Sequence, residues 1–292
     1  MNFDTVIQAF VNGLLLGGVY GGLAIGLSLI LGVLRILNLA HSAVLIFAAL
    51  IYWEFVNGLG LDPLAMIIPV VVIAYFFGLL VHRGIAQVLV KESDTTVLLA
   101  FFGLLVILES IAVMIWTTDT RTVTLGYLSE VIQIGSVSIP MSRVVGASIT
   151  VVVLVALHFF LTRTLTGSAI RGLSQNRDVA AMVGIEVNRL SRRVFAAGIA
   201  FAAFGGIVLA MVQSFNPQEH YRWLAWAFLV VIIGGLGSAL RTLVAGVAVG
   251  VIETMVGILI PFQYTYLVLY GVLAVALLVR SEGLGGVKQR II

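Results

Sequence analysis

Long apolar segments alternate with short polar connections along almost the whole chain. A helix needs about 20 apolar residues to cross the hydrocarbon core of a bilayer. Ile36–Trp53 and Leu224–Leu236 are short, and the first is polar at its start, which predicts a broken or re-entrant helix. The pattern predicts one all-α polytopic membrane domain over residues 1–292 with eight or nine transmembrane helices. The candidate spans are Val6–Leu34, Ile36–Trp53, Pro63–Val81, Val97–Trp116, Val144–Leu161, Val194–Gln213, Leu224–Leu236, Leu243–Ile260 and Tyr264–Val279.

Two longer polar stretches interrupt this pattern. The first, about residues 117–142, is rich in Thr, Ser and Gly. It suits extended or hairpin structure at Val123–Leu125, Val131–Ile134 and Val137–Ile139. Two interpretations stay open for it: a surface that receives a partner, or a solvated connector.

The second polar stretch, about residues 163–193, contains a predicted short helix over Ser174–Ile185. Ser174 or Asn176 can cap this helix, Asp178 suits its first turn, and Gly184 can end it in the left-handed conformation. Asn188 or Ser191 can then cap the next span. The alternatives are a docking helix and a solvated loop. The helix reads Ser174-Gln175-Asn176-Arg177-Asp178-Val179-Ala180-Ala181-Met182-Val183-Gly184-Ile185, with Ala180 and Ala181 forming a small face.

The composition supports a lipid environment. The chain is 61% hydrophobic and 10% charged, with a mean hydropathy of +1.17, whereas soluble domains carry about 25% charged residues. The absence of cysteine excludes disulfides and thiol-based sites. The net charge of +3 lies in loops and indicates membrane topology rather than nucleic-acid binding. The N-terminus lacks a basic region, so we expect no cleaved signal peptide.

Basic residues predict the orientation. If the loop after Val81 is cytoplasmic, all of the sixteen Lys and Arg residues fall inside except Arg121, Arg143 and Arg222. Cytoplasmic loops carry such an excess of positive charge. With nine crossings, this predicts an external N-terminus, a cytoplasmic C-terminus, an external loop at 117–142 and a cytoplasmic loop at 163–193.

The first span is rich in glycine at helical spacing. Missing Cβ atoms let helix backbones approach closely, which favours association in lipid. The glycines serve either packing inside the bundle or contact with a second membrane subunit. They are Gly13, Gly17, Gly18, Gly21, Gly22 and Gly26.

Few polar side chains fall at membrane depth. Asn38 and His41 are three residues apart, which predicts one shared helix face. Together with Glu253 they are candidates for the translocation pathway, because intramembrane polar groups are costly unless they are paired or wetted. The alternative is that all three only hydrogen-bond helices together. We assign no role to Glu109.

Motifs for catalysis and for ATP binding are absent from the sequence. The four histidines are scattered, without H-E-x-x-H, and no G-x-S-x-G occurs. A Walker A loop requires Gly-Lys before Ser or Thr, whereas Lys91 precedes Glu92 and Lys288 precedes Gln289. We therefore expect no enzyme activity, no metal and no cofactor in this chain, with any ATP and Mg²⁺ bound by another subunit.

The order of several motifs resembles the permease family of branched-chain amino acid ABC importers, specifically its shorter permease paralogue. The resemblance covers nearly the whole chain. Its motifs are Gly17-Gly18-Val19-Tyr20, Gly26-Leu27, Asn38-Leu39-Ala40-His41, Thr164-Leu165-Thr166-Gly167 to Arg171, Gln175-Asn176-Arg177, Ala180, Gly184-Ile185, Pro217, Ala227-Phe228, Gly234-Gly235-Leu236-Gly237-Ser238, Glu253, Leu278-Val279-Arg280 and Gly283-Leu284.

The resemblance implies a multi-pass protein of a bacterial inner membrane that imports a solute without modifying it. It assigns Ser174–Ile185 to contact with a cytoplasmic ATPase. It also implies a second homologous permease, two ATP-binding subunits, an external solute-binding protein and surrounding lipid. The family serves branched-chain amino acids, urea, amides and carboxylates, so the solute stays open. The rival hypothesis is an ion-coupled transporter or channel that uses Glu109, Glu253 and His41 as ion sites; a membrane enzyme is a third.

Overall fold

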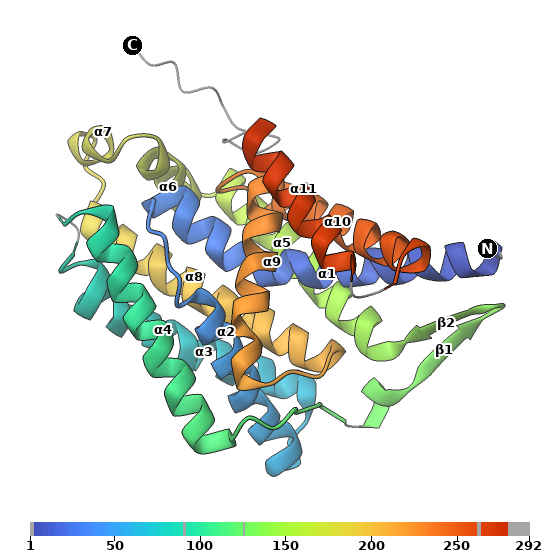
Figure 1. Ribbon diagram of the computed structural model, residues 1–292. Helices are drawn as coiled ribbons and strands as arrows, with labels where there is room; N and C mark the ends of the chain where they lie inside the picture. The colour runs from blue at the N-terminus through green and yellow to red at the C-terminus, as the bar shows by residue number, and fades with distance from the viewer. Residues whose placement is uncertain (1–2, 90–91, 125, 262–263, 280–292) are drawn as a thin grey trace.

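The computed structural model describes residues 3–89, 92–124, 126–261 and 264–279. The described part is almost entirely helical (Figure 1). Lys91, Arg280, Gly283, Leu284 and Lys288, which entered the sequence argument, lie outside it. The α-helices are α1 (Phe3–Leu34), α2 (His41–Trp53), α3 (Pro63–Val81), α4 (Asp94–Trp116), α5 (Met141–Arg163), α6 (Leu165–Gln175), α7 (Arg177–Met182), α8 (Val187–Val212), α9 (His220–Gly234), α10 (Ala239–Leu259) and α11 (Thr265–Val279).

Short elements complete the chain. Two π-helical turns, Glu54–Gly58 and His82–Ala86, extend α2 and α3. Two 3₁₀ turns lie at Gly126–Ser129 and Pro217–Glu219. Strands β1 (Val131–Ile134) and β2 (Val137–Pro140) form an antiparallel hairpin, as the sequence predicts. Val123 and Thr124 lie in irregular backbone, so the strand predicted at Val123–Leu125 is wrong for these two residues.

Seven described helical segments are long and apolar enough to cross a membrane. They match seven of the nine predicted spans. The remaining two predictions correspond to α9 and α11, which have 15 residues each and are shorter than the about 20 residues of a full span. The spans are Phe3–Leu34, His41–Gly58, Pro63–Ala86, Asp94–Trp116, Met141–Arg163, Val187–Val212 and Ala239–Leu259.

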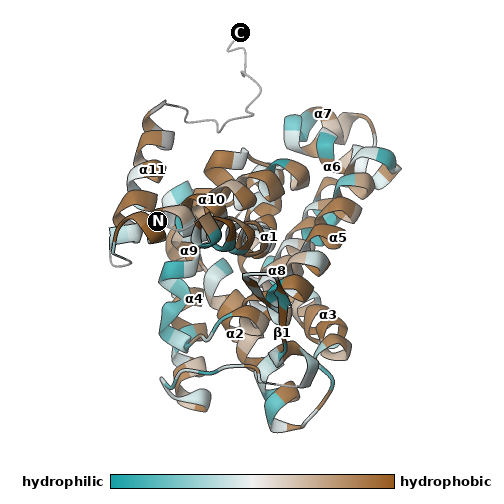
Figure 2. Cartoon of the chain, turned by 90° about the vertical axis from the view of Figure 1, so that its right-hand side faces the viewer, coloured by the Kyte–Doolittle hydropathy of each residue, from teal (hydrophilic) through white to brown (hydrophobic). Residues whose placement is uncertain are grey.

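The outward-facing side chains of the peripheral spans are apolar. Ile68 and Phe76 of α3 are 70% and 60% exposed, and Met114 of α4 is 83% exposed. Figure 2 shows this apolar colouring along the flanks of the helices. Water would oppose such a surface, whereas lipid tails accept it. The chain is therefore an all-α, polytopic membrane protein.

Helix α1 lies in the middle of the bundle and packs against α5, α8, α9 and α10 (Figure 1). A Cβ on Gly17 would collide with the backbone of Val247, and one on Gly250 with the backbone of Gly17. These glycines let antiparallel α1 and α10 touch through their backbones. All six glycines of the first span face elements of the same chain: Gly13, Gly17 and Gly21 face α10, Gly18 and Gly22 face α5, and Gly26 faces α8.

The polar connections lie at opposite ends of α1. Near its N-terminus, Gln8 accepts a hydrogen bond from the Ser138 backbone N–H of the hairpin at 2.7 Å. Near its C-terminus, Val33, Leu34 and Leu173 of α6 belong to one hydrophobic cluster. The hairpin and the α6–α7 segment therefore lie on opposite sides of the membrane domain, as the charge pattern predicts (Figure 1).

Candidate functional site

The segment from α6 to α8 is held in place by local hydrogen bonds. Thr164 caps α6, because its hydroxyl accepts from the Gly167 backbone N–H at 2.9 Å. Gly167 also has to be small: a Cβ there would strike the carbonyls of Phe160 and Leu161. The sharp turn from α5 into α6 thus depends on one threonine and one glycine.

The predicted single helix over Ser174–Ile185 is wrong. Ser174 and Gln175 form the last turn of α6, and the chain breaks at Asn176, which is extended. The Asn176 side chain then caps α7, accepting from the backbone N–H groups of Asp178 and Val179 at 2.9 and 3.1 Å. Side-chain capping competes with helix continuation, so an asparagine favours a break where the apolar pattern continues.

Helix α7 ends as its residue types predict. Gly184 has a φ of +86°, a conformation that glycine adopts at little cost. The Ile185 N–H donates to the Ala180 carbonyl at 3.1 Å and closes the turn. Helix α8 then begins at Val187 without a side-chain cap on Glu186, so neither Asn188 nor Ser191 caps it as predicted.

The exposed face of α7 differs from the predicted small face. Ala180 is only 3% exposed and faces the protein. Arg177, Asp178, Ala181 and Gly184 are exposed. The apolar side chains presented outward are Val179, Met182 and Val183, at 49%, 78% and 71% exposure. We call these three residues the α7 patch.

The α6–α7 junction also contacts the end of α1. A polar cavity of about 260 Å³ lies at this contact, lined by Leu34, Arg35 and Ser191 together with Leu173–Arg177. Arg35 adopts a positive φ of 57°, which non-glycine residues rarely adopt. The chain reverses at this residue, and residues 36–41 run back into the bundle. We call residues 36–41 the re-entrant segment. The α6–α7 junction lies directly beside its start.

The re-entrant segment brings Asn38 and His41 into the interior. Helix α2 begins only at His41, so the prediction that both residues share a helix face is wrong. His41 Nε2 donates to the Leu23 carbonyl of α1 at 2.9 Å, and Leu23 lies 11 residues, about 16 Å, before the end of α1. Asn38 is fully buried, and neither end of its amide has a hydrogen-bond partner among the described residues.

Glu253 is paired with a residue that the sequence analysis did not single out as a site. Its carboxylate, on α10, accepts a hydrogen bond from the Tyr20 hydroxyl of α1 at 2.5 Å. The Tyr20 ring lies 6.5 Å from Trp223 and 6.3 Å, edge to face, from Trp226. Trp223 and Trp226 of α9 are fully buried. Glu253 is 6% exposed, so its carboxylate lies inside the protein, bonded to Tyr20, rather than in lipid.

Glu109 also has a partner that sequence reasoning missed. Its carboxylate lies 3.7 Å from Nε2 of His220, at the start of α9, and the pair is an ion pair when the imidazole is protonated. Nδ1 of His220 donates to the Pro217 carbonyl at 3.1 Å. Apart from the rarity of charges in apolar segments, no sequence signal links two residues so far apart.

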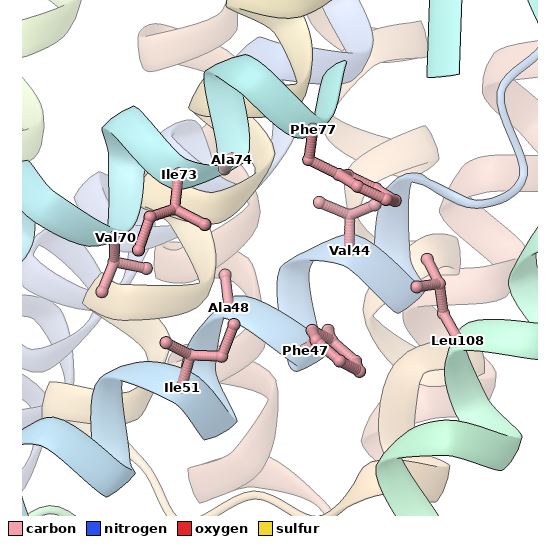
Figure 3. Close-up of a pocket in the computed structure, with 9 residues that line it drawn as sticks. All are labelled: Val44, Phe47, Ala48, Ile51, Val70, Ile73, Ala74, Phe77 and Leu108. Atoms are coloured by element: carbon pink, nitrogen blue, oxygen red, sulfur yellow. The ribbon is translucent and has the colours of Figure 1, made fainter. Parts of the chain in front are cut away.

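A second cavity is lined by apolar side chains and opens at the surface beside the half-exposed Ile73. It has a volume of about 110 Å³ and lies between α2, α3 and α4. Figure 3 shows its side chains facing one another: Val44, Phe47, Ala48, Ile51, Val70, Ile73, Ala74, Phe77 and Leu108. No donor or acceptor lines it, so it cannot orient a zwitterionic solute. Among the described residues there is also no cluster of three potential metal ligands.

Comparison with known proteins identifies the family to which the chain is similar. A family described as "Branched-chain amino acid transport system / permease component" matches residues 9–278. The permease protein LivH of Salmonella typhimurium, from a high-affinity branched-chain amino acid transport system, is 26% identical over 96% of this chain and 95% of its own. BraD of Pseudomonas aeruginosa is 25% identical with the same coverage of both chains.

A second type of permease is also similar. LivM of Salmonella typhimurium is 28% identical over 50% of this chain and 35% of its own. The family match covers nearly all of the membrane domain, including the capped α7 helix, the re-entrant segment with Asn38 and the Tyr20–Glu253 pair. The chain therefore belongs to the family of permease components of branched-chain amino acid transport systems.

Proposed function

We propose that the chain is the transmembrane permease subunit of an ABC importer for a small amino acid-like solute. In this proposal two separate subunits bind and hydrolyse ATP with Mg²⁺, and an external protein delivers the solute. The chain itself catalyses no chemical step. The LivH, BraD and LivM relatives support the solute class and a second, homologous permease partner.

The α7 patch carries the proposal. Val179, Met182 and Val183 form an exposed apolar surface on a six-residue helix capped at both ends. Such a surface is suited to binding in a cleft of another protein. The charge bias predicts that the α7 patch lies in the cytoplasm. The sequence provides no ATP-binding loop, which is consistent with an ATPase as the partner.

The contacts of the α6–α7 junction support a coupling route from the α7 patch to the interior. The α6–α7 junction borders Arg35, and the chain from Arg35 leads through Asn38 to His41. Movement of α7 with its partner would therefore move the re-entrant segment. Asn38, His41 and Glu253 remain our proposed pathway residues, because they are buried polar side chains at membrane depth.

Transport in proteoliposomes tests the coupling role. We expect Met182→Glu in the reconstituted complex to lower ATP-dependent uptake of radiolabelled leucine at least tenfold, because a carboxylate would be desolvated in the cleft. Asn188→Glu is the matched control, since it adds the same charge at an exposed position in the first turn of α8. Equal uptake by both variants would contradict the docking assignment, and uptake by this chain alone, driven by an ion gradient, would favour the secondary-transporter hypothesis.

A further inference from the structure

A long groove runs along α8 between α3 and α5. Both helices pack on α8, and the space between them holds two hollows of about 540 and 370 Å³. Tyr75, Val153, Ala197 and Phe201 line both hollows, so the two form one continuous channel. Figure 2 shows α3, α8 and α5 on the same flank of the molecule. We call this channel the α8 groove.

The walls of the α8 groove are almost entirely apolar. Ile67, Val71 and Phe204 line the end farther from the basic loop, and Leu157 and Phe160 line the nearer end. From Arg193 to Phe204 the helix rises about 16 Å. One leaflet contributes half of a hydrocarbon core that is about 30 Å thick. The groove therefore has the length of the acyl region of one leaflet.

A cation marks one end of this apolar channel. Arg193 is exposed and lines the groove together with Thr166, at the first turn of α6. It forms no ion pair or hydrogen bond with another described residue. By contrast, Arg189 one turn earlier pairs with Glu186 at 3.3 Å. The guanidinium of Arg193 thus remains available to an anion at the membrane surface.

We propose that the α8 groove binds an anionic phospholipid, with an acyl chain along α8 and the phosphate on Arg193. An amphiphile with one long apolar part and one anionic head matches the groove in length and in charge. Arginine binds phosphate through paired N–H donors. Basic sites between transmembrane helices recognise acidic headgroups in this way. The bound lipid would fill the space between α3 and α5 and hold them against α8.

Native mass spectrometry of the full-length chain, purified with its accompanying subunits, tests this proposal. The probes are dioleoyl phosphatidylglycerol and dioleoyl phosphatidylcholine in equal amounts. We expect the wild type to retain phosphatidylglycerol preferentially, and Arg193→Gln to retain about fivefold less of it. Arg192→Gln is the matched control: it removes the same charge at the preceding residue, which does not line the groove. Ala197→Phe fills the channel and should reduce binding of both lipids.

Three results would overturn the assignment. Equal retention of the two lipids by the wild type would mean unselective annular lipid. Equal loss in Arg192→Gln and Arg193→Gln would assign the effect to the charge of the whole loop. Lipid binding unaffected by Ala197→Phe would place the lipid elsewhere. If Ala197→Phe does not fold, the comparison of Arg192→Gln with Arg193→Gln still tests whether the lipid headgroup binds Arg193.

Discussion

Gly17 illustrates how single residues determine the packing of this bundle. Its α-carbon lies so close to α10 that a Cβ would overlap the backbone of Val247. Because that obstacle is backbone, it cannot move aside as a flexible side chain would. In lipid, where apolar burial gives little driving force, such close contact provides much of the helix association.

This packing predicts opposite effects for one substitution at two sites. Gly17→Ala should destabilise the protein by about 1–3 kcal/mol, because α1 and α10 must separate. Gly103→Ala should be neutral or stabilise by up to about 1 kcal/mol, because nothing lies within 4 Å of the added methyl group and alanine favours helix. Thermal unfolding in detergent measures both. Equal melting temperatures would contradict the close approach.

Because the Tyr20–Glu253 hydrogen bond is buried, we expect loss of the Tyr20 hydroxyl to lower the stability of the protein. Tyr20→Phe keeps the ring against Trp226 but removes a donor from the buried carboxylate. We expect a loss of about 1–3 kcal/mol in stability. Tyr264→Phe is the control, because this tyrosine is 50% exposed and its hydroxyl forms no hydrogen bond with another described residue. A Tyr20→Phe protein as stable as the control would show that the bond contributes nothing.

At the scale of elements, local interactions explain where the shortest α-helix begins and ends. Helix α7 has six residues, too few to be stable without stabilised ends. The Asn176 side chain accepts from two orphan N–H groups of the first turn, those of Asp178 and Val179, and Gly184 supplies the left-handed turn at the other end. The α7 patch therefore has a fixed shape before any partner binds.

Removing the cap should loosen this helix without altering the bundle. Asn176→Ala should cost about 0.5–2 kcal/mol locally, seen as faster hydrogen–deuterium exchange over residues 177–183. Exchange in α1 and α8 should not change. Asn188→Ala serves as the control, since Asn188 is exposed and does not cap α8. Unchanged exchange in α7 would mean that its order comes from elsewhere.

Local signals predicted some features of this segment and missed others. The turn at Gly184 follows from residue chemistry alone, whereas residue chemistry left both Ser174 and Asn176 as candidate caps. The burial of Ala180 does not follow from residue chemistry, because it depends on which face of α7 meets the protein. Similarly, spacing placed Asn38 and His41 on one helix, but Arg35 reverses the chain and α2 starts later. Local periodicity cannot show a reversal that tertiary packing stabilises.

At the scale of the whole molecule, hydropathy predicted the all-α membrane domain and most spans. It could not predict the Tyr20–Glu253 contact, which joins residues 233 positions apart. Nor could it predict that α3 and α5 leave a groove on α8. Such features arise from how whole helices pack, and glycine positions show only that close packing occurs somewhere.

The molecule as a whole has two surfaces at opposite ends of α1. The hairpin β1–β2 is tied to the N-terminal end through Gln8, and the α7 patch lies near the other end. An importer needs one face that receives the solute and another that contacts the subunits that hydrolyse ATP. The proposed function assigns the hairpin side to the outside and α7 to an ATPase.

Purification of the tagged chain from its native membrane tests the central claim most directly. The account predicts that two ATP-binding subunits co-purify with it, that the complex hydrolyses MgATP, and that Met182→Glu, unlike Asn188→Glu, loses those subunits. Isolation of the chain without any ATP-binding protein, under conditions that keep the Asn188→Glu and wild-type proteins folded, would contradict it.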